Sequence, residues 1–250
     1  MVKKDIKISY ESGLEISIKY SESRLKEILS NLDKKKYFAI TATPIPLKEE
    51  ILDIEEDKIK NLMLHPAYTR YAGWNMGFAS NTADLLPTFN GIKKESGTWS
   101  LQLFRNAHIE FCAEVDYSFS WNQPEEEFRE KPRFNPYAIT EFPVSFIRFL
   151  KELAKLKNIT NGYRIIMAFL NCGTYRLRPY APLNIGYSIG QDNMADLNSW
   201  IYKKEFKELN SENDEEAFIF IERLYSTFNL SRDKIPFFSE KKVFEMKKEW

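Results

Sequence analysis

Residues 99–115 read WSLQLFRNAHIEFCAEV, and in this segment apolar and polar side chains alternate on both sides of a short polar turn. Side chains of a β-strand repeat every two residues, so the segment predicts an amphipathic hairpin with one apolar face. The residues of that face all have odd numbers, so they can oppose one another only across a loop with an odd number of residues. A three-residue loop, 105–107, sets Leu103 opposite Ile109 and Leu101 opposite Phe111. Loops of this kind commonly end in a left-handed residue, which would be Ala107 here.

The other face of the hairpin is polar. It carries Ser100, Gln102, Glu110, Cys112 and Glu114. Antiparallel sheets commonly leave one face in water, so we interpret these side chains as a solvated strand face. The alternative is a metal-binding or acid–base cluster of His108, Glu110 and Glu114.

Composition limits the class of protein. The 250 residues can bury a full core, and 36 basic residues balance 36 acidic residues. A formal net charge of zero argues against a dedicated non-specific nucleic-acid binder, which needs a large cationic surface. Two cysteines, Cys112 and Cys172, indicate reduced thiols rather than a disulfide framework. No apolar run reaches the roughly 20 residues that span a bilayer, and we expect a cytoplasmic protein without a membrane partner.

The order of elements predicts an α+β fold, with mainly antiparallel sheets packed against long amphipathic helices. We expect an N-terminal hairpin over residues 6–18, a helix from Ser21 or Ser23, a buried strand over 37–45 and a helix from Asp53. Further helices are predicted at 140–157 and after Ser211, with strands at 164–170, 174–177, 186–189 and, at a sheet edge, 199–209. Because strands lead twice into a long helix, the chain can be divided into similar halves at residues 1–157 and 162–250, or it forms one continuous domain.

Basic and aromatic residues form the best candidate binding set. Arg176 and Arg178 share one strand face, with Tyr175 on the other, and paired arginines suit phosphate or carboxylate groups. Cations beside aromatic rings also hold single-stranded nucleic acid. The full ligand-binding or nucleic-acid-binding set is Arg176, Arg178, Tyr175, Lys93, Lys94, Arg105, Trp74 and Arg70. The alternative is that these side chains pair with the abundant acidic residues.

No catalytic signature, metal site or cofactor-binding motif stands out. The nine glycines form no phosphate-binding loop, so no nucleotide cofactor is expected. We interpret His65, before Pro66, as a residue that ends a helix, and Cys172 as a buried thiol. The acidic residues between 49 and 57 are interpreted as a solvated helix start rather than a metal site.

Several short motifs occur in an order that is similar to that of a known family. They are Pro44-Ile45-Pro46, Leu64-His65-Pro66, Arg70-Tyr71-Ala72-Gly73-Trp74, Asn90-Gly91-Ile92, the hairpin from Leu101 to Phe111, and Gly162-Tyr163 after a helix. This order, over roughly residues 35–200, resembles the region that follows the AlbA-like, Schlafen-type DNA-binding domain of many bacterial proteins. The chain departs from that pattern because only about 35 residues precede the region, and because Ala107 stands where a glycine is expected. The resemblance implies an accessory module of a bacterial defence or regulatory system, and it assigns no catalytic residue.

We therefore expect a non-catalytic protein that acts by contact with a protein partner or with further copies of itself. One alternative is a nucleic-acid-binding module that uses the basic and aromatic set. The other is a hydrolase or nuclease of unrecognised type that uses His65 or His108 with scattered carboxylates.

Overall fold

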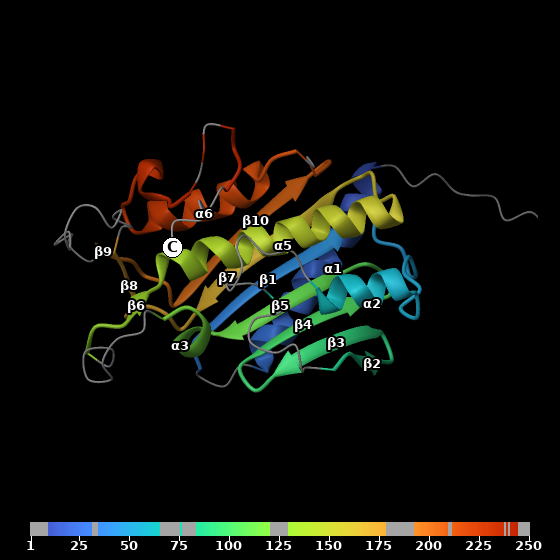
Figure 1. The fold of residues 1–250 in the computed structure, drawn as a ribbon, viewed down its shortest axis with the longest axis horizontal. Helices are drawn as coiled ribbons and strands as arrows, with labels where there is room; N and C mark the ends of the chain where they lie inside the picture. The colour runs from blue at the N-terminus through green and yellow to red at the C-terminus, as the bar shows by residue number, and fades with distance from the viewer. Residues whose placement is uncertain are drawn as a thin grey trace, which may run out of the picture.

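The computed structural model describes residues 10–31, 35–65, 76, 84–120, 130–178, 193–209, 212–237, 239 and 241–244. It confirms the predicted α+β class, because an antiparallel sheet of seven strands packs against helices (Figure 1). Across the sheet the strands are β10 (Ser199–Phe206), β7 (Tyr163–Leu170), β1 (Tyr37–Pro44), β5 (Ile109–Glu114), β4 (Trp99–Phe104), β3 (Gly91–Ser96) and β2 (Leu86–Thr88). The sheet thus contains strands from both of the halves considered from the sequence.

The β4–β5 hairpin has the predicted register. Leu101 lies opposite Phe111 and Leu103 opposite Ile109. The amide of Ala107 donates to the carbonyl of Phe104, and Ala107 has a φ of 62°, in the left-handed region. The three-residue loop and its left-handed last residue are therefore confirmed. The parity of the apolar pattern indicated the loop length, and the loop type indicated its left-handed last residue.

One face of the sheet carries the aromatic core. The helices α2 (Asp57–Leu64), α5 (Pro136–Lys157) and α6 (Glu215–Thr227) pack on this face (Figure 1). The ring of Phe111 on β5 stacks on Phe142 of α5, with centroids 5.2 Å apart, and Tyr202 of β10 meets Phe220 of α6 edge-on. Apolar burial of this extent is the main stabilising term of a domain.

Helix boundaries differ from the sequence-based expectation by about a turn. The helix expected from Asp53 begins at Asp57, and the helix expected from Thr140 begins at Pro136. Asn135 supplies the N-cap of α5, since its side chain accepts from the amide of Tyr137. A proline at the first helical position costs no hydrogen bond, so Pro136 extends the helix and Pro143 lies inside it rather than in its first turn.

The N-terminal segment is a helix, and the predicted hairpin is wrong for the residues that the structure describes. Helix α1 (Tyr10–Ser30) covers the sheet face opposite to the aromatic core (Figure 1). Its buried residues Gly13, Ser17 and Ser21 are small and lie four residues apart. A Cβ atom on Gly13 would stand 2.5 Å from the Cβ of Pro46, so glycine permits the close approach. Because this stripe is small and polar, the first half of α1 lacks the apolar period by which a helix is recognised, whereas the helix expected from Ser21 or Ser23 is the second half of α1, where Leu25 and Ile28 are buried.

A second, three-stranded sheet lies beside the main one. It contains β6 (Arg133–Phe134), β8 (Arg176–Leu177) and β9 (Asn193–Met194). The segment 174–177 therefore does not continue the main sheet as expected, and residues 186–189 lie outside the described residues. The edge position predicted for the strand from Ser199 is confirmed by β10. The remaining short elements are α3 (Val115–Ser118) and the 3₁₀ helix Arg232–Lys234.

Candidate functional site

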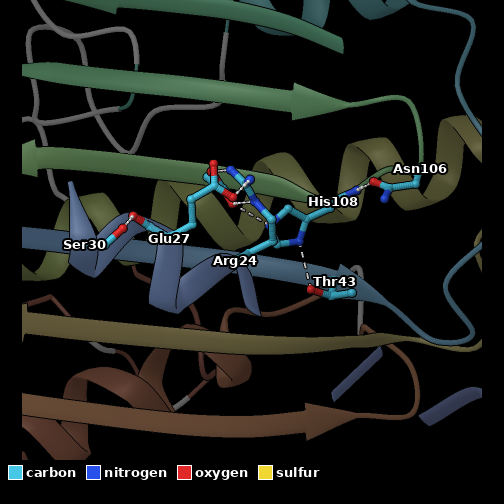
Figure 2. A network of polar contacts seen from close by, with 7 residues as sticks. Arg24, Glu27, Ser30, Thr43, Asn106 and His108 are labelled. Atoms are coloured by element: carbon cyan, nitrogen blue, oxygen red, sulfur yellow. Dashed lines mark hydrogen bonds and ion pairs between the residues drawn. The ribbon is translucent and has the colours of Figure 1, made fainter. Parts of the chain in front are cut away.

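A buried polar network joins α1 to the sheet, and Figure 2 shows it from close by. His108, which immediately precedes β5, lies between Thr43 of β1 and Glu110 of β5. Its Nδ1 is 2.8 Å from the Thr43 hydroxyl, and its Nε2 is 2.9 Å from Oε1 of Glu110. Arg24 of α1 completes the network with two hydrogen bonds to the Glu110 carboxylate, at 2.7 and 2.9 Å. His108 and Thr43 have no exposed surface, and Glu110 is 6% exposed.

The partners of His108 define its protonation state. An ionised carboxylate only accepts hydrogen bonds, so Nε2 carries the proton that is donated to Glu110. Burial lowers the pKa of His108, and the hydrogen bond to Glu110 only partly offsets this effect. The neutral ring then leaves Nδ1 as an acceptor, and the Thr43 hydroxyl donates to it.

Glu110 stays ionised for a different reason. Burial raises the pKa of its carboxyl group, but the hydrogen bonds from His108 and Arg24 outweigh burial, and the net shift is downward. The guanidinium of Arg24 also lies 4.7 Å from the ring centroid of Phe104. The Glu110 carboxylate thus has an opposite charge beside it and hydrogen bonds from both Arg24 and His108, as a buried charge requires.

A second ionic cluster lies under the same helix. Arg164 of β7 is 7% exposed and donates to the Ser21 hydroxyl at 3.0 Å. It also bonds to Glu22 of α1 at 2.6 Å and to Glu205 of β10. Lys203 of β10 reaches the same Glu22 carboxylate at 2.6 Å. The two clusters join α1 to the sheet by ionic contacts, in addition to the burial of its apolar residues Leu25 and Ile28.

The order hydroxyl, imidazole and carboxylate is the one that activates nucleophiles in acyl transfer. Here Thr43 and His108 are fully buried beneath α1, so a substrate has no path to them in this conformation. Glu114, the third member of the sequence-based cluster, lies at the far end of β5 and pairs with Lys35. No group of three metal-ligating side chains occurs in the described part of the chain. In the described structure, the network joins α1 to β5 through the contacts of Arg24 with Glu110.

This arrangement overturns one expectation from the sequence. The polar face of the hairpin is not solvated at His108 and Glu110, because α1 covers both. The two arginines that hold the helix, Arg24 and Arg164, were missed by sequence reasoning. The signal that could have found them is the stripe of small residues, which is typical of a helix that packs closely on a neighbour.

The predicted binding set is divided between two sheets. Tyr175 is fully buried, its ring lies 4.6 Å from that of Phe134, and its hydroxyl bonds to Asp116. Arg176 lies in β8, where its amide donates to the carbonyl of Pro132, and Arg178 directly follows that strand.

The other members of the set lie at the opposite side of the main sheet. Lys93 of β3 pairs with Glu95, and Arg105 lies 3.4 Å from Glu50. Lys94 is 2% exposed, and its burial lowers its pKa. The structure does not bring these three residues together with Arg176 and Arg178. Arg70 and Trp74 lie outside the described residues.

The remaining candidates have structural surroundings. His65 directly follows α2, where its amide donates to the carbonyl of Asn61, and it lines a shallow hollow of about 290 Å³ between α2 and α5. Burial raises the pKa of the Cys112 and Cys172 thiols to about 12, which leaves both protonated at neutral pH. Glu56, from the acidic segment, pairs with Lys157 of α5.

Within the described residues, none of the helices combines the length and the apolar composition that crossing a bilayer requires. Comparisons with protein-family models, curated protein sequences and solved structures gave no match.

Proposed function

We propose that this chain is a non-catalytic accessory protein that acts by contact with another protein. Its place would be the bacterial defence or regulatory setting that the Schlafen-type resemblance implies. The observation that carries the proposal is an exposed apolar tip on the β2–β3 hairpin. Phe89, in the turn, is 95% exposed, Leu86 is 45% exposed, and Pro87 between them is exposed as well. Neighbouring exposed apolar side chains that are held together are typical of protein-binding sites.

The backbone around Phe89 is well fixed. Thr88 pairs with Gly91, and the carbonyl of Asn90 accepts from the amide of Arg105 at 2.8 Å. A Cβ atom on Gly91 would lie 2.1 Å from a carbonyl oxygen of β4, so the close approach needs glycine. A turn held in this way presents its aromatic ring with little loss of conformational entropy when a partner binds.

The reactive side chains of the described residues support the same proposal. His108 and Glu110 are engaged with each other, Cys172 is buried, and Glu55 and Glu56 of the acidic segment pair with lysines. These groups stabilise the fold, so we assign the binding of a partner to the exposed apolar tip of the β2–β3 hairpin.

The test places a photo-crosslinking amino acid at position 89 in the expressed chain. We expect a discrete crosslinked partner that is absent when the same amino acid replaces Tyr117, a 71% exposed aromatic residue in α3. The Phe89→Ser variant should lose the co-purifying partner and keep its melting temperature. Equal crosslinking from positions 89 and 117, or a partner retained by Phe89→Ser, would contradict the proposal.

A further inference from the structure

The outer edge of β10 is a long, regular strand edge. All eight residues of β10 pair with β7 without a bulge, and none is proline or glycine. Four of them, Trp200, Ile201, Tyr202 and Phe206, belong to residue types that favour strands. In the part of the chain that the structure describes, no strand pairs with the other side of β10. Such an edge is a template for a further strand.

The opposite edge of the sheet is protected in a way that β10 is not. Strand β2 has three residues, and Pro87 in its centre has no amide hydrogen to donate. Short edge strands and proline are common devices against edge pairing. The contrast marks β10 as the edge that is open to pairing.

The hydrogen bonds beside β7 show which backbone groups of β10 point outward. The amide of Ile45 donates to the carbonyl of Gly162, on the β1 side, and the amide of Asn171 donates to the carbonyl of Asn198, on the β10 side. Backbone groups of successive strand residues point to opposite sides, so odd-numbered residues of β7 bond to β10. Their partners in β10 are the even-numbered residues.

The odd-numbered residues of β10 therefore direct their amides and carbonyls away from β7. These residues are Ser199, Ile201, Lys203 and Glu205, and all but Ile201 are classed as exposed. Lys203 and Glu205 would ordinarily deter a second strand by their charge. Here they are already paired, with Glu22 and Arg164 respectively, so they do not leave uncompensated charge at the edge.

We infer that β10 pairs antiparallel with β10 of a second copy of this chain, around a two-fold axis at Tyr202. Four registers place the axis within two residues of the middle of the strand, and an axis at Ile201 pairs only residues 199–203, whereas an axis at Tyr202 pairs residues 199–205. An axis at Lys203 or at Lys204 sets two lysines directly opposite each other, which is destabilising. The axis at Tyr202 opposes no like charges.

The register centred on Tyr202 also gives complementary neighbours. Lys204 of each copy lies opposite Trp200 of the other, so the lysine faces an uncharged residue rather than a like charge. Glu205 lies opposite Ser199, and Tyr202 of one copy lies opposite Tyr202 of the other, so no like charges face each other. The interface is isologous, so it closes as a dimer and does not propagate into a fibre.

The first test removes one outward amide. Ile201→Pro deletes a hydrogen-bond donor of the new ladder and leaves the ladder with β7 intact, because proline is tolerated where the amide faces solvent. We expect the unmodified chain to sediment near twice 29.5 kDa and the Ile201→Pro variant near 29.5 kDa. The matched control Ile201→Thr keeps the amide and should remain dimeric.

A second test is independent of how the chain tolerates proline. In this register residue 202 faces itself in a non-hydrogen-bonded pair, with the Cβ separation that a disulfide requires. Tyr202→Cys should therefore form a crosslinked dimer on oxidation, whereas Lys204→Cys should not.

Three results would overturn the inference: a monomeric unmodified chain, a dimeric Ile201→Pro variant, or equal crosslinking by the two cysteine variants. A dimer that is abolished by Phe89→Ser and not by Ile201→Pro would show self-association through the β2–β3 hairpin instead. Conversely, loss of the β10 dimer leaves the photo-crosslinking test at position 89 unaffected, so the two proposals can fail separately.

Discussion

Replacing Arg24 with methionine removes the charge that α1 places over the sheet while keeping much of the side-chain volume. In the variant, the Glu110 carboxylate loses two hydrogen bonds, at 2.7 and 2.9 Å, and keeps only the one from His108. The side chain of Glu110 is 7% exposed, so water cannot replace the lost partner without displacing α1. We expect the free energy of unfolding to fall.

The size of the loss follows from burial. Removing one partner of a buried ion pair costs about 3–5 kcal/mol, because the other charge is left uncompensated. The Arg24 side chain retains 19% of its exposure, which favours the lower end, about 3 kcal/mol. For a domain of this size such a loss lowers the melting temperature by about 6–12 °C.

Urea unfolding followed by circular dichroism measures the effect. The control is Lys26→Met on the exposed side of the same helix, which should change the free energy of unfolding by at most about 0.5 kcal/mol. The double variant Arg24→Met/Glu110→Gln should lose less than the sum of the two single variants, because neither charge then remains buried alone. A loss for Arg24→Met no larger than that for Lys26→Met would refute a stabilising role of the Arg24–Glu110 pair.

Three further predictions follow from the described contacts. Burial holds the pKa of His108 below 6.5, so the contribution of His108 to stability should be complete above pH 6.5 and decline below it. The pKa of Glu110 is also lowered, so the contribution of Glu110 should decline only below about pH 4.5. Urea unfolding at pH 8, 6 and 5 should show a smaller decline in the free energy of unfolding for His108→Gln than for the unmodified chain. Gly162→Ala should destabilise the chain by more than about 1–2 kcal/mol in a thermal melt, because φ is +80° and a Cβ atom would lie 1.8 Å from a carbonyl oxygen, whereas Gly97→Ala meets nothing within 4 Å. In mass spectrometry after iodoacetamide treatment, Cys172 should stay unmodified in the native chain and react after unfolding, because its pKa is about 12.

The parts of the fold that were predictable depend on contacts close in sequence. The parity of the apolar residues set the β4–β5 register, and a run of buried apolar residues identified β1 and β7. The edge position of β10 was predictable because apolar and charged residues alternate in its sequence. Helix ends were displaced because capping by Asn135 and the position of Pro136 outweighed the apolar period.

The candidate site was not predictable in the same way. Arg24 and Glu110 are 86 residues apart, and Arg164 and Glu22 are 142 residues apart. Each side chain alone is an ordinary surface charge, and charge carries no period that reveals its partner. The alternation of Leu14, Ile16 and Ile18 favoured a strand, yet Ile16 is 45% exposed in the helix that forms.

Local alternation was thus enough to establish the hairpin and the length of its loop, because side-chain direction in a strand repeats with a period of two. The α+β class followed from the order of strands and helices. Only the packed chain could establish that α1 lies on the polar face of the sheet and turns His108 and Glu110 into buried groups. The physical reason is that burial depends on what covers a surface. Here the cover is a helix whose small-residue stripe fits a partner that lies far along the chain.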